Sequence, residues 1–197
     1  MNTLLHLYTL LAMTQSRVTN IPLYLLFNVL FKFLAAQDLS LPALTTTSLL
    51  LQHASFFAQG GSNAISSIDL SSAYNGVADY NAGVVALLTF VGNWAAPGYW
   101  VLATTLLLLR KRKASFLQQT DPKRRPSVWR AHVALLTVFV AAALVAVMAA
   151  CTALRTHLFI WTVFSPKYLY SMAWSLGQHL AVNVLLGGFL FWAGSFE

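Results

Sequence analysis

Six apolar stretches follow one another along the chain, and this succession limits what the sequence can fold into. They occupy residues 4–13, 21–36, 41–59, 82–109, 131–154 and 168–192. Only 9% of the 197 residues are charged and 58% are hydrophobic, whereas a soluble domain carries about 25% charged residues. Such a chain cannot cover a water-facing surface, so the sequence predicts an all-α, polytopic transmembrane helix bundle with about five to six spans.

The apolar stretches differ in length, and the differences carry structural predictions. Residues 4–13 provide about ten apolar positions, whereas a transmembrane helix needs about 20, so we expect a partial span there. Residues 82–109 would make a helix about 42 Å long, which exceeds the hydrocarbon core of a bilayer. Pro97 and Gly98 lie near the middle of this stretch and predict a kink or two helical halves.

Basic residues are concentrated in one segment, and this asymmetry predicts the orientation of the chain. Residues 110–130 contain eight Lys and Arg together with Asp121, whereas residues 60–81 contain no Lys or Arg. The positive-inside rule therefore makes 110–130 a basic cytosolic loop, 60–81 a lumenal loop and the carboxyl terminus cytosolic. No strand or aromatic platform accompanies the basic cluster, so we expect no nucleic-acid partner. The cluster is suited instead to attracting anionic lipid headgroups.

Polar side chains interrupt the apolar stretches at a few positions. Among them are Gln52, His53, Gln59, Asn93, Gln178, His179 and Asn183. Polar groups inside a membrane are costly and mark candidates for function. Two interpretations stay open. One is a polar cavity for a lipid headgroup or a proton path, and the other is interhelical hydrogen bonding, typically worth about 0.6 kcal/mol for each pair.

The loop at 60–81 is rich in small and polar residues. Gly60 and Gly61 can end a helix. Serines in the loop can cap short helices, at Ser66, Ser67, Ser71 and Ser72. Asp69 has two interpretations, which are contact with an amine-bearing headgroup and helix capping beside these serines. A re-entrant or surface-lying segment is the expected structure.

The sequence contains no constellation of residues that could carry catalysis. Its one glutamate is the last residue, its four aspartates are scattered, and its five histidines are dispersed. Cys151, the one cysteine, lies inside an apolar stretch, where we expect it to pack as a small hydrophobe. A metal-dependent hydrolase or transferase needs several Asp, Glu, His or Cys ligands that converge. We therefore predict no catalytic residue and no metal ligand in this chain.

Three segments resemble a known family. They are residues 50–80 (LLQHASFFAQGGSNAISSIDLSSAYNGVADY), residues 92–97 (GNWAAP) and residues 155–170 (RTHLFIWTVFSPKYLY). Together they resemble the C-terminal membrane region of GPI ethanolamine phosphate transferases, most of all the fungal transferase 2 branch. The resemblance extends over roughly residues 21–193.

The resemblance implies an activity whose catalytic part lies outside this chain. Members of the family carry a large N-terminal lumenal domain of the alkaline-phosphatase type, which binds a divalent metal, usually zinc. That domain moves phosphoethanolamine from phosphatidylethanolamine to a mannose of the GPI precursor, the second mannose in the transferase 2 branch. The catalytic threonine and the metal ligands of the family match no position here. We therefore expect a C-terminal fragment, a split gene product or a truncated gene model, inactive alone.

The predicted function is the membrane portion of such a transferase, a multi-pass protein of the endoplasmic reticulum. The implied partners are phosphatidylethanolamine, the GPI precursor and a small multi-span stabilising subunit. The candidate contacts to lipid headgroups are Gln52, His53, Asn63, Asp69, Asn75 and His179. Two alternatives stay open. A non-enzymatic scaffold or accessory subunit of GPI-anchor assembly is one, and a small transporter is the other. The lack of acidic residues within the spans and of internal repeats argues against the transporter.

Overall fold

The computed structural model describes residues 2–60, 74, 77, 79–118, 128–157, 162 and 165–196. These residues form helices and short connections, and none of them lies in a strand. The first helices are α1 (Asn2–Thr14), a short 3-10 turn (Val18–Asn20), α2 (Ile21–Ala36) and α3 (Leu41–Ala58). The long helices α4 (Ala82–Gln118) and α5 (Val128–Ala153) follow. The last helical run consists of α6 (Ser165–Ala173), the π-helical segment η6 (Trp174–Leu186) and α7 (Gly187–Gly194).

Four of these helical runs are long and apolar enough to cross a membrane. They are Val18–Ala36, Ala82–Ala114, Val128–Ala153 and Ser165–Gly194. This result confirms the predicted helical membrane bundle. With 13 residues, α1 is too short to cross alone. Helix α3 has 18 residues, but several of them are polar and buried. Because of this polarity, α3 is not one of the four apolar runs.

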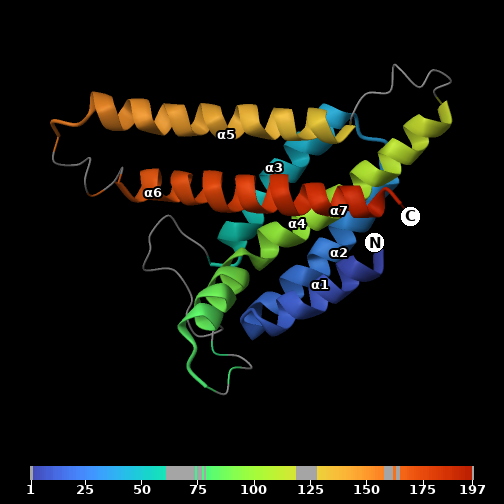
Figure 1. Ribbon diagram of the computed structural model, residues 1–197, viewed down its shortest axis with the longest axis horizontal. Helices are drawn as coiled ribbons and strands as arrows, with labels where there is room; N and C mark the ends of the chain where they lie inside the picture. Colours follow the sequence, from blue (N-terminus) through green and yellow to red (C-terminus); the bar gives the residue numbers. More distant parts are fainter. Residues whose placement is uncertain are drawn as a thin grey trace.

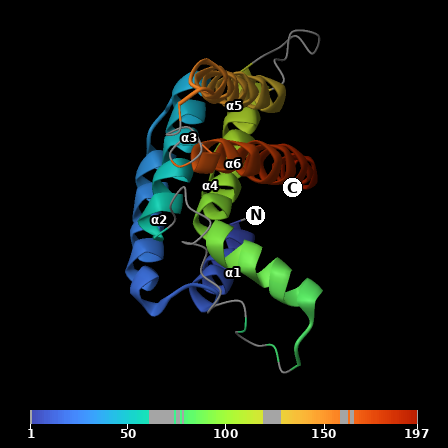
Figure 2. The ribbon, with the colours of Figure 1, turned by 90° about the vertical axis from the view of Figure 1, so that its left-hand side faces the viewer.

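The helices lie in layers (Figure 1). On one side α5 lies beside the α6–η6–α7 run, on the other side α1 lies beside α2, and α3 and α4 cross between them (Figure 2). The most extensive helix contact joins α3 to α4. The two central helices therefore hold the outer pairs together.

Contacts at the helix ends show that successive runs alternate in direction. At the carboxyl end of α4, Lys111 Nζ donates to the backbone oxygen of Leu39 in the α2–α3 turn at 2.7 Å. The neighbouring Arg112 lies over the ring of Phe191 in α7. At the opposite end, Asn20 Nδ2 donates to the backbone oxygen of Gln59 at 3.5 Å. Both chain termini therefore lie at the end that carries the basic residues (Figure 1).

The helix bounds differ from the predicted stretches mainly at α4. Helix α2 begins and ends at the limits of the predicted stretch 21–36, and Pro22 lies in its first turn, where proline suits a helix. Helix α4 continues to Gln118, so the first part of the predicted loop 110–130 is helical. Arg, Lys, Leu and Gln are good helix formers, and the first helix breaker after Pro97 and Gly98 is Pro122. High charge alone therefore does not end this helix.

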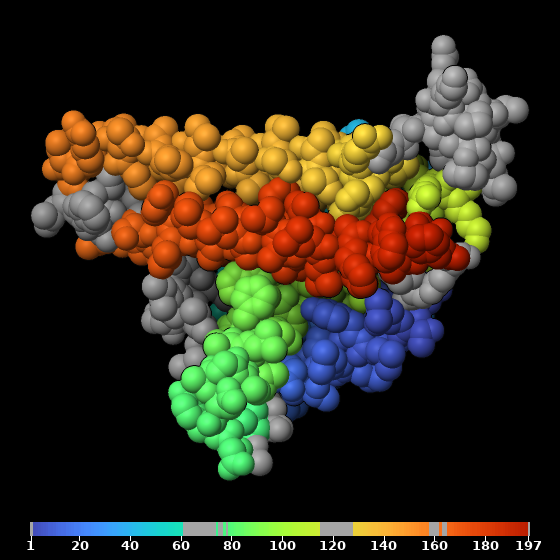
Figure 3. Space-filling model, viewed as in Figure 1, coloured from blue at the N-terminus to red at the C-terminus, as the bar shows by residue number. Residues whose placement is uncertain are grey.

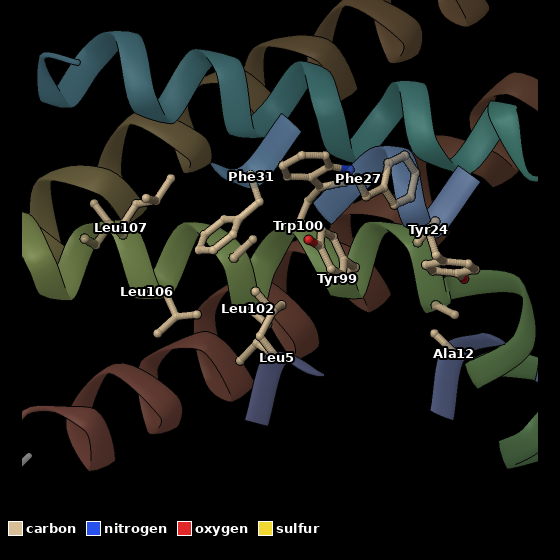
Figure 4. Packing of buried hydrophobic residues seen from close by; sticks show 14 of the residues in the cluster. Leu5, Ala12, Tyr24, Phe27, Phe31, Tyr99, Trp100, Leu102, Leu106 and Leu107 are labelled. Atoms are coloured by element: carbon tan, nitrogen blue, oxygen red, sulfur yellow. The ribbon is translucent and has the colours of Figure 1, made fainter. Parts of the chain in front are cut away.

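The main hydrophobic cluster lies where α1 and α2 pack on the middle of α4. Trp100 and Tyr99 are almost completely buried there. The ring centroid of Phe27 lies 5.4 Å from that of Trp100 and 5.6 Å from that of Tyr99. Leu5 from α1 completes the cluster (Figure 4). These contacts fix the first two helices on α4, even though α1 is short.

Helix α4 changes direction part of the way along its length (Figure 2), and Pro97 lies within it. Proline has no N–H to donate and its ring crowds the preceding turn, so nearby backbone groups lose their helical partners. Side chains from other helices bind backbone groups beside it. Gln59 Oε1 accepts from the N–H of Ala96 at 3.2 Å, and Tyr8 Oη donates to the carbonyl of Ala95 at 2.8 Å. Gln59 Nε2 in turn donates to Tyr24 Oη at 2.6 Å, so α1, α2 and the residue that caps α3 support the bend.

Candidate intramembrane polar site

A stripe of polar residues runs along the buried face of α3. It consists of Thr45, Ser48, Gln52 and Ser55. Spacings of three and four residues place them on one side of the helix. They meet polar residues of the neighbouring helices, namely Thr104 of α4, His132 of α5, and Gln178 and Asn183 of η6. Beside these contacts, Thr137 of α5 binds His179 of η6. We call this whole set the polar seam, and it contains no formally charged side chain.

Gln52 is the centre of the polar seam and is fully buried. Its Oε1 atom accepts from Gln178 Nε2 at 2.9 Å and from Asn183 Nδ2 at 3.0 Å. Its Nε2 atom donates to Ser48 Oγ at 3.1 Å. Ser48 Oγ is also hydrogen-bonded to Thr104 Oγ1 at 2.7 Å. Directly, or through Ser48, this amide therefore links α3, α4 and η6.

The π-helical winding of η6 explains how two side chains reach one oxygen. Gln178 and Asn183 are five residues apart, and in an α-helix such residues point about 140° away from each other. A π-helix bonds residue i to i+5, so residues five apart lie near one another. The buried residues of η6 are Trp174, Gln178, His179 and Asn183. Their spacing matches the longer π-helical period.

Two histidines bind threonines at the edge of the polar seam. His132 Nδ1 lies 2.8 Å from Thr45 Oγ1, and His179 Nε2 lies 3.0 Å from Thr137 Oγ1. Each threonine hydroxyl lies within hydrogen-bond distance of a carbonyl of its own helix, that of Leu41 or Val133. A hydroxyl has only one hydrogen, and it is used in that bond, so we assign the N–H to the imidazole in each pair. In neutral His179, Nδ1 is then an acceptor.

Two acceptors of the polar seam have no partner within the described part of the chain. They are Gln178 Oε1 and His179 Nδ1, and both atoms are buried. A polar atom left unpaired in an apolar environment costs free energy. These atoms are therefore suited to accept a hydrogen bond from a bound water, hydroxyl or ammonium group.

His53 lies in a separate aromatic cluster. Its ring stacks on Trp174 with a centroid distance of 3.9 Å, and its Nδ1 lies 3.4 Å from Tyr170 Oη. Phe56 contacts the rings of Trp94, Tyr170 and Trp174. The cluster is next to the end of α3 that leads toward residues 60–81. His53 and Gln52 are adjacent in sequence, yet His53 packs in the aromatic cluster whereas Gln52 lies in the polar seam.

The structure brings together only part of the predicted site. Gln52 and His179 belong to the polar seam, whereas His53 belongs to the aromatic cluster. The predicted contacts Asn63, Asp69 and Asn75 lie outside the described residues. Sequence reasoning did not single out Thr45, Ser48, Thr104, His132 or Thr137. The helical spacing of the polar residues in 41–59 is the signal that would have found the first two.

The described residues do not fit a divalent-metal site of the kind that the family resemblance implies. In the described ranges, no three His, Cys, Asp or Glu side chains gather closely enough to hold a metal ion. His132 and His179 each direct one ring nitrogen to a threonine hydroxyl. Within the described ranges, these side chains therefore supply no set of ligands for a divalent metal.

Four membrane-length helical runs, together with an uncharged polar seam among α3, α4, α5 and η6, define a polytopic helical membrane protein. Comparison with known families gives the particular assignment. Residues 1–196 match the family described as the GPI ethanolamine phosphate transferase membrane region, and the chain belongs to this family. The predicted resemblance is thereby confirmed.

Curated relatives of the chain carry the name GPI ethanolamine phosphate transferase 2. The protein of Aspergillus oryzae is 52% identical over 177 residues, which cover 90% of this chain and 19% of the relative. The protein of Aspergillus fumigatus is 47% identical over 86% of this chain and 20% of the relative. That of Saccharomyces cerevisiae is 36% identical over 92% of this chain and 22% of the relative. The chain thus spans about a fifth of the length of these relatives. No solved structure matches it.

Proposed function

We propose that this chain is the membrane region of an enzyme that transfers phosphoethanolamine from phosphatidylethanolamine to the second mannose of the GPI precursor. The observation that carries the proposal is the 52% identity to GPI ethanolamine phosphate transferase 2 of Aspergillus oryzae over 90% of this chain. The chain corresponds to only 19% of that relative. The transfer itself is therefore assigned to a lumenal catalytic domain outside the chain, and the chain alone is inactive.

The role of the membrane region in this proposal is to hold lipid substrates in position. Gln178 Oε1 and His179 Nδ1 are buried acceptors without a described partner. The hydroxyl or ammonium group of a lipid headgroup can donate to them. Positioning two substrates beside a catalytic domain lowers the entropic part of the barrier. The polar seam thereby supports binding and orientation, and no bond is made or broken there.

The proposed location is the membrane of the endoplasmic reticulum, with residues 110–130 and the carboxyl terminus in the cytosol. The basic residues at the end of α4 lie near the α2–α3 turn and α7, since Lys111 binds Leu39 and Arg112 lies over Phe191. The positive-inside rule assigns such an end to the cytosol. Residues 60–81 are then lumenal, on the side of the proposed catalytic domain.

A chimaera tests the proposal. The corresponding segment of the Aspergillus oryzae transferase 2 is replaced by this chain and expressed in fungal cells that lack their own transferase 2. We expect mass spectrometry of the GPI precursors to show phosphoethanolamine on the second mannose again. The chain expressed alone should leave the precursors unmodified. A well-expressed chimaera without activity would contradict the membrane-region role, and activity of the chain alone would contradict its inactivity.

The exposed surface of α5 favours an accessory role as the second candidate. The buried residues of α5 are Val128, His132, Leu136 and Val140, all in its first half. The remainder presents apolar side chains along the edge of the molecule (Figure 3). Such a surface suits contact with another membrane protein, for example a small multi-span stabilising subunit. Co-purification and the chimaera together distinguish the two candidates. An accessory subunit should retain a specific membrane-protein partner, and the chimaera that contains it should be inactive.

A further inference from the structure

The end of the bundle near the carboxyl end of α4 carries a strong excess of positive charge. We call it the basic end. Its described cations are Lys32, Arg110, Lys111, Arg112, Lys113 and Arg130. Of the carboxylates in the described ranges, only Asp38 lies at this end. Among the described residues, six cations and one carboxylate therefore lie at this end, and Lys111 pairs with that carboxylate at 3.5 Å.

Aromatic contacts hold two guanidinium groups on different neighbours of α4. The Arg110 guanidinium lies 5.8 Å from the ring centroid of Phe31 in α2. The Arg112 guanidinium lies 5.5 Å from the ring centroid of Phe191 in α7. Cation–π contact uses the face of a guanidinium and leaves N–H groups at its edge for other acceptors. Lys111 instead donates its ammonium group to the backbone of the α2–α3 turn.

The position of these cations along α4 corresponds to the boundary of a membrane. Leu106, Leu107 and Leu108 are buried, and the four cations follow Leu109 directly. With 37 residues, α4 is about 55 Å long, whereas the hydrocarbon core of a bilayer is about 30 Å thick. The helix must therefore leave the hydrocarbon region, and the change from leucines to cations places that exit at the level of the lipid phosphates.

We propose that the basic end binds anionic phospholipid headgroups of the leaflet that it faces. Arg110 and Arg112 bind phosphate oxygens on the α2 side and the α7 side of α4, and Lys113 adds a third positive charge. Guanidinium groups match the geometry of phosphate oxygens. The proposal requires only that the chain lies in a membrane, so it stands or falls separately from the transferase assignment.

Lipid selection by the purified chain tests this proposal. The whole chain is reconstituted in nanodiscs made from phosphatidylcholine with phosphatidylserine as the only anionic lipid, and the lipids retained after mild extraction are measured by native mass spectrometry. We expect enrichment of phosphatidylserine around the wild-type chain. The triple variant R110Q/R112Q/K113Q should lower this enrichment about tenfold or more, because each basic residue near an anionic surface contributes about fivefold.

Matched variants separate binding at this site from general charge effects. Arg155→Gln removes an exposed cation beyond α5, at the opposite end, and should leave the enrichment unchanged. R110K/R112K keeps the charge and should retain most of it. If the triple variant loses helicity by circular dichroism, the single variant Arg112→Gln is measured instead, with a loss of about fivefold expected. Equal retention of both lipids by the wild type, or equal losses for Arg155→Gln and the basic-end variants, would overturn the proposal.

Discussion

At the scale of single residues, the polar seam depends on one carbonyl oxygen. Gln52 Oε1 accepts from both Gln178 and Asn183. Gln52→Leu should leave two buried donors without their acceptor. We expect the free energy of unfolding to fall by about 1–3 kcal/mol, since this is the typical cost of a buried group left unpaired. Thermal unfolding of the purified chain in detergent measures the effect.

Two further variants show whether lost hydrogen bonds cause that effect. Gln37→Leu changes an exposed glutamine after α2 and should leave the unfolding temperature near that of the wild type. The triple variant Q52L/Q178L/N183L removes the donors together with the acceptor and should recover most of the lost stability. A triple variant less stable than Gln52→Leu would contradict this explanation. It would mean that the three amide side chains stabilise the fold by more than the hydrogen bonds among themselves.

Gly98 makes a second prediction at this scale, because it allows α1 to approach α4 closely. A Cβ atom at position 98 would collide with the hydroxyl of Tyr8, which donates to the carbonyl of Ala95 at 2.8 Å. Gly98→Ala should destabilise the chain by about 1–3 kcal/mol, as overpacking does. Gly83→Ala serves as the control, since among the described residues a Cβ there meets only Asn81 Oδ1, at 3.4 Å. The same thermal assay applies.

Combining the Gly98 variant with Tyr8→Phe identifies the cause of its effect. Removing the hydroxyl relieves the closest part of the collision, so G98A/Y8F should be less destabilised than the sum of the two single variants. Additive losses would indicate that Tyr8 and Gly98 do not act on each other. In that case the cost of Gly98→Ala would have to come from another contact.

The polarity of single residues made part of the polar seam predictable. Gln52, Gln178, His179 and Asn183 stand out because amides and imidazoles are rare within apolar stretches. Thr45, Ser48 and Thr104 do not stand out, because threonine and serine satisfy their hydroxyls on the carbonyls of their own helix. Two of these three, Thr45 and Thr104, do so here. Their role across the helix interface depends on tertiary contacts that the sequence does not display.

At the scale of elements, η6 carries the least predictable feature of the fold. The apolar stretches predict helices, and α2 has the limits of the stretch 21–36. No local pattern marked the π-helical winding of Trp174–Leu186. The hydrogen bonds from Gln178 and Asn183 to Gln52 on α3 stabilise this winding. The charge pattern also does not indicate that α4 continues to Gln118, because the positive-inside rule predicts a loop at 110–130 and takes no account of helix propensity.

The π-helical winding predicts tolerance to a deletion. Ala181 is exposed and lies between Gln178 and Asn183. Deleting Ala181 makes these residues four apart, a spacing that an ordinary α-helix keeps on one face. Both can then still reach Gln52, so we expect the free energy of unfolding to change by about 1 kcal/mol or less, within the cost of one hydrogen bond. Unfolding in detergent again gives the measurement.

A deletion in α5 provides the contrast. Ala134 is also exposed, but it precedes the buried residues Leu136 and Val140 in an α-helix without π winding. Deleting it should rotate both by about 100° away from the interface, with a loss of about 2 kcal/mol or more from the exposed apolar side chains. Equal losses for the two deletions would contradict the role assigned to π winding in η6.

At the scale of the whole molecule, the bundle separates two kinds of surface. The basic end gathers the start of α1, the α2–α3 turn, the end of α4 and α7. The opposite end gathers the α1–α2 turn and the end of α3, beside the aromatic cluster. The polar seam lies among α3, α4, α5 and η6. This arrangement, with charge at the surface and polar groups kept inside, is typical of a polytopic membrane protein.

The orientation proposed for the molecule predicts which residues a membrane-impermeant thiol reagent can reach. Lys113 at the basic end and Tyr80 at the opposite end are both exposed, so a cysteine at either position is open to the reagent when it faces the bath. In a Cys151→Ser background, Lys113→Cys should react in sealed vesicles of the endoplasmic reticulum, whose outer surface is cytosolic. Tyr80→Cys should react only after detergent opens the vesicles. Labelling of a known lumenal protein reports any leak, and reaction of Tyr80→Cys but not Lys113→Cys in sealed vesicles would reverse the orientation, because both positions belong to one bundle and exchange sides together.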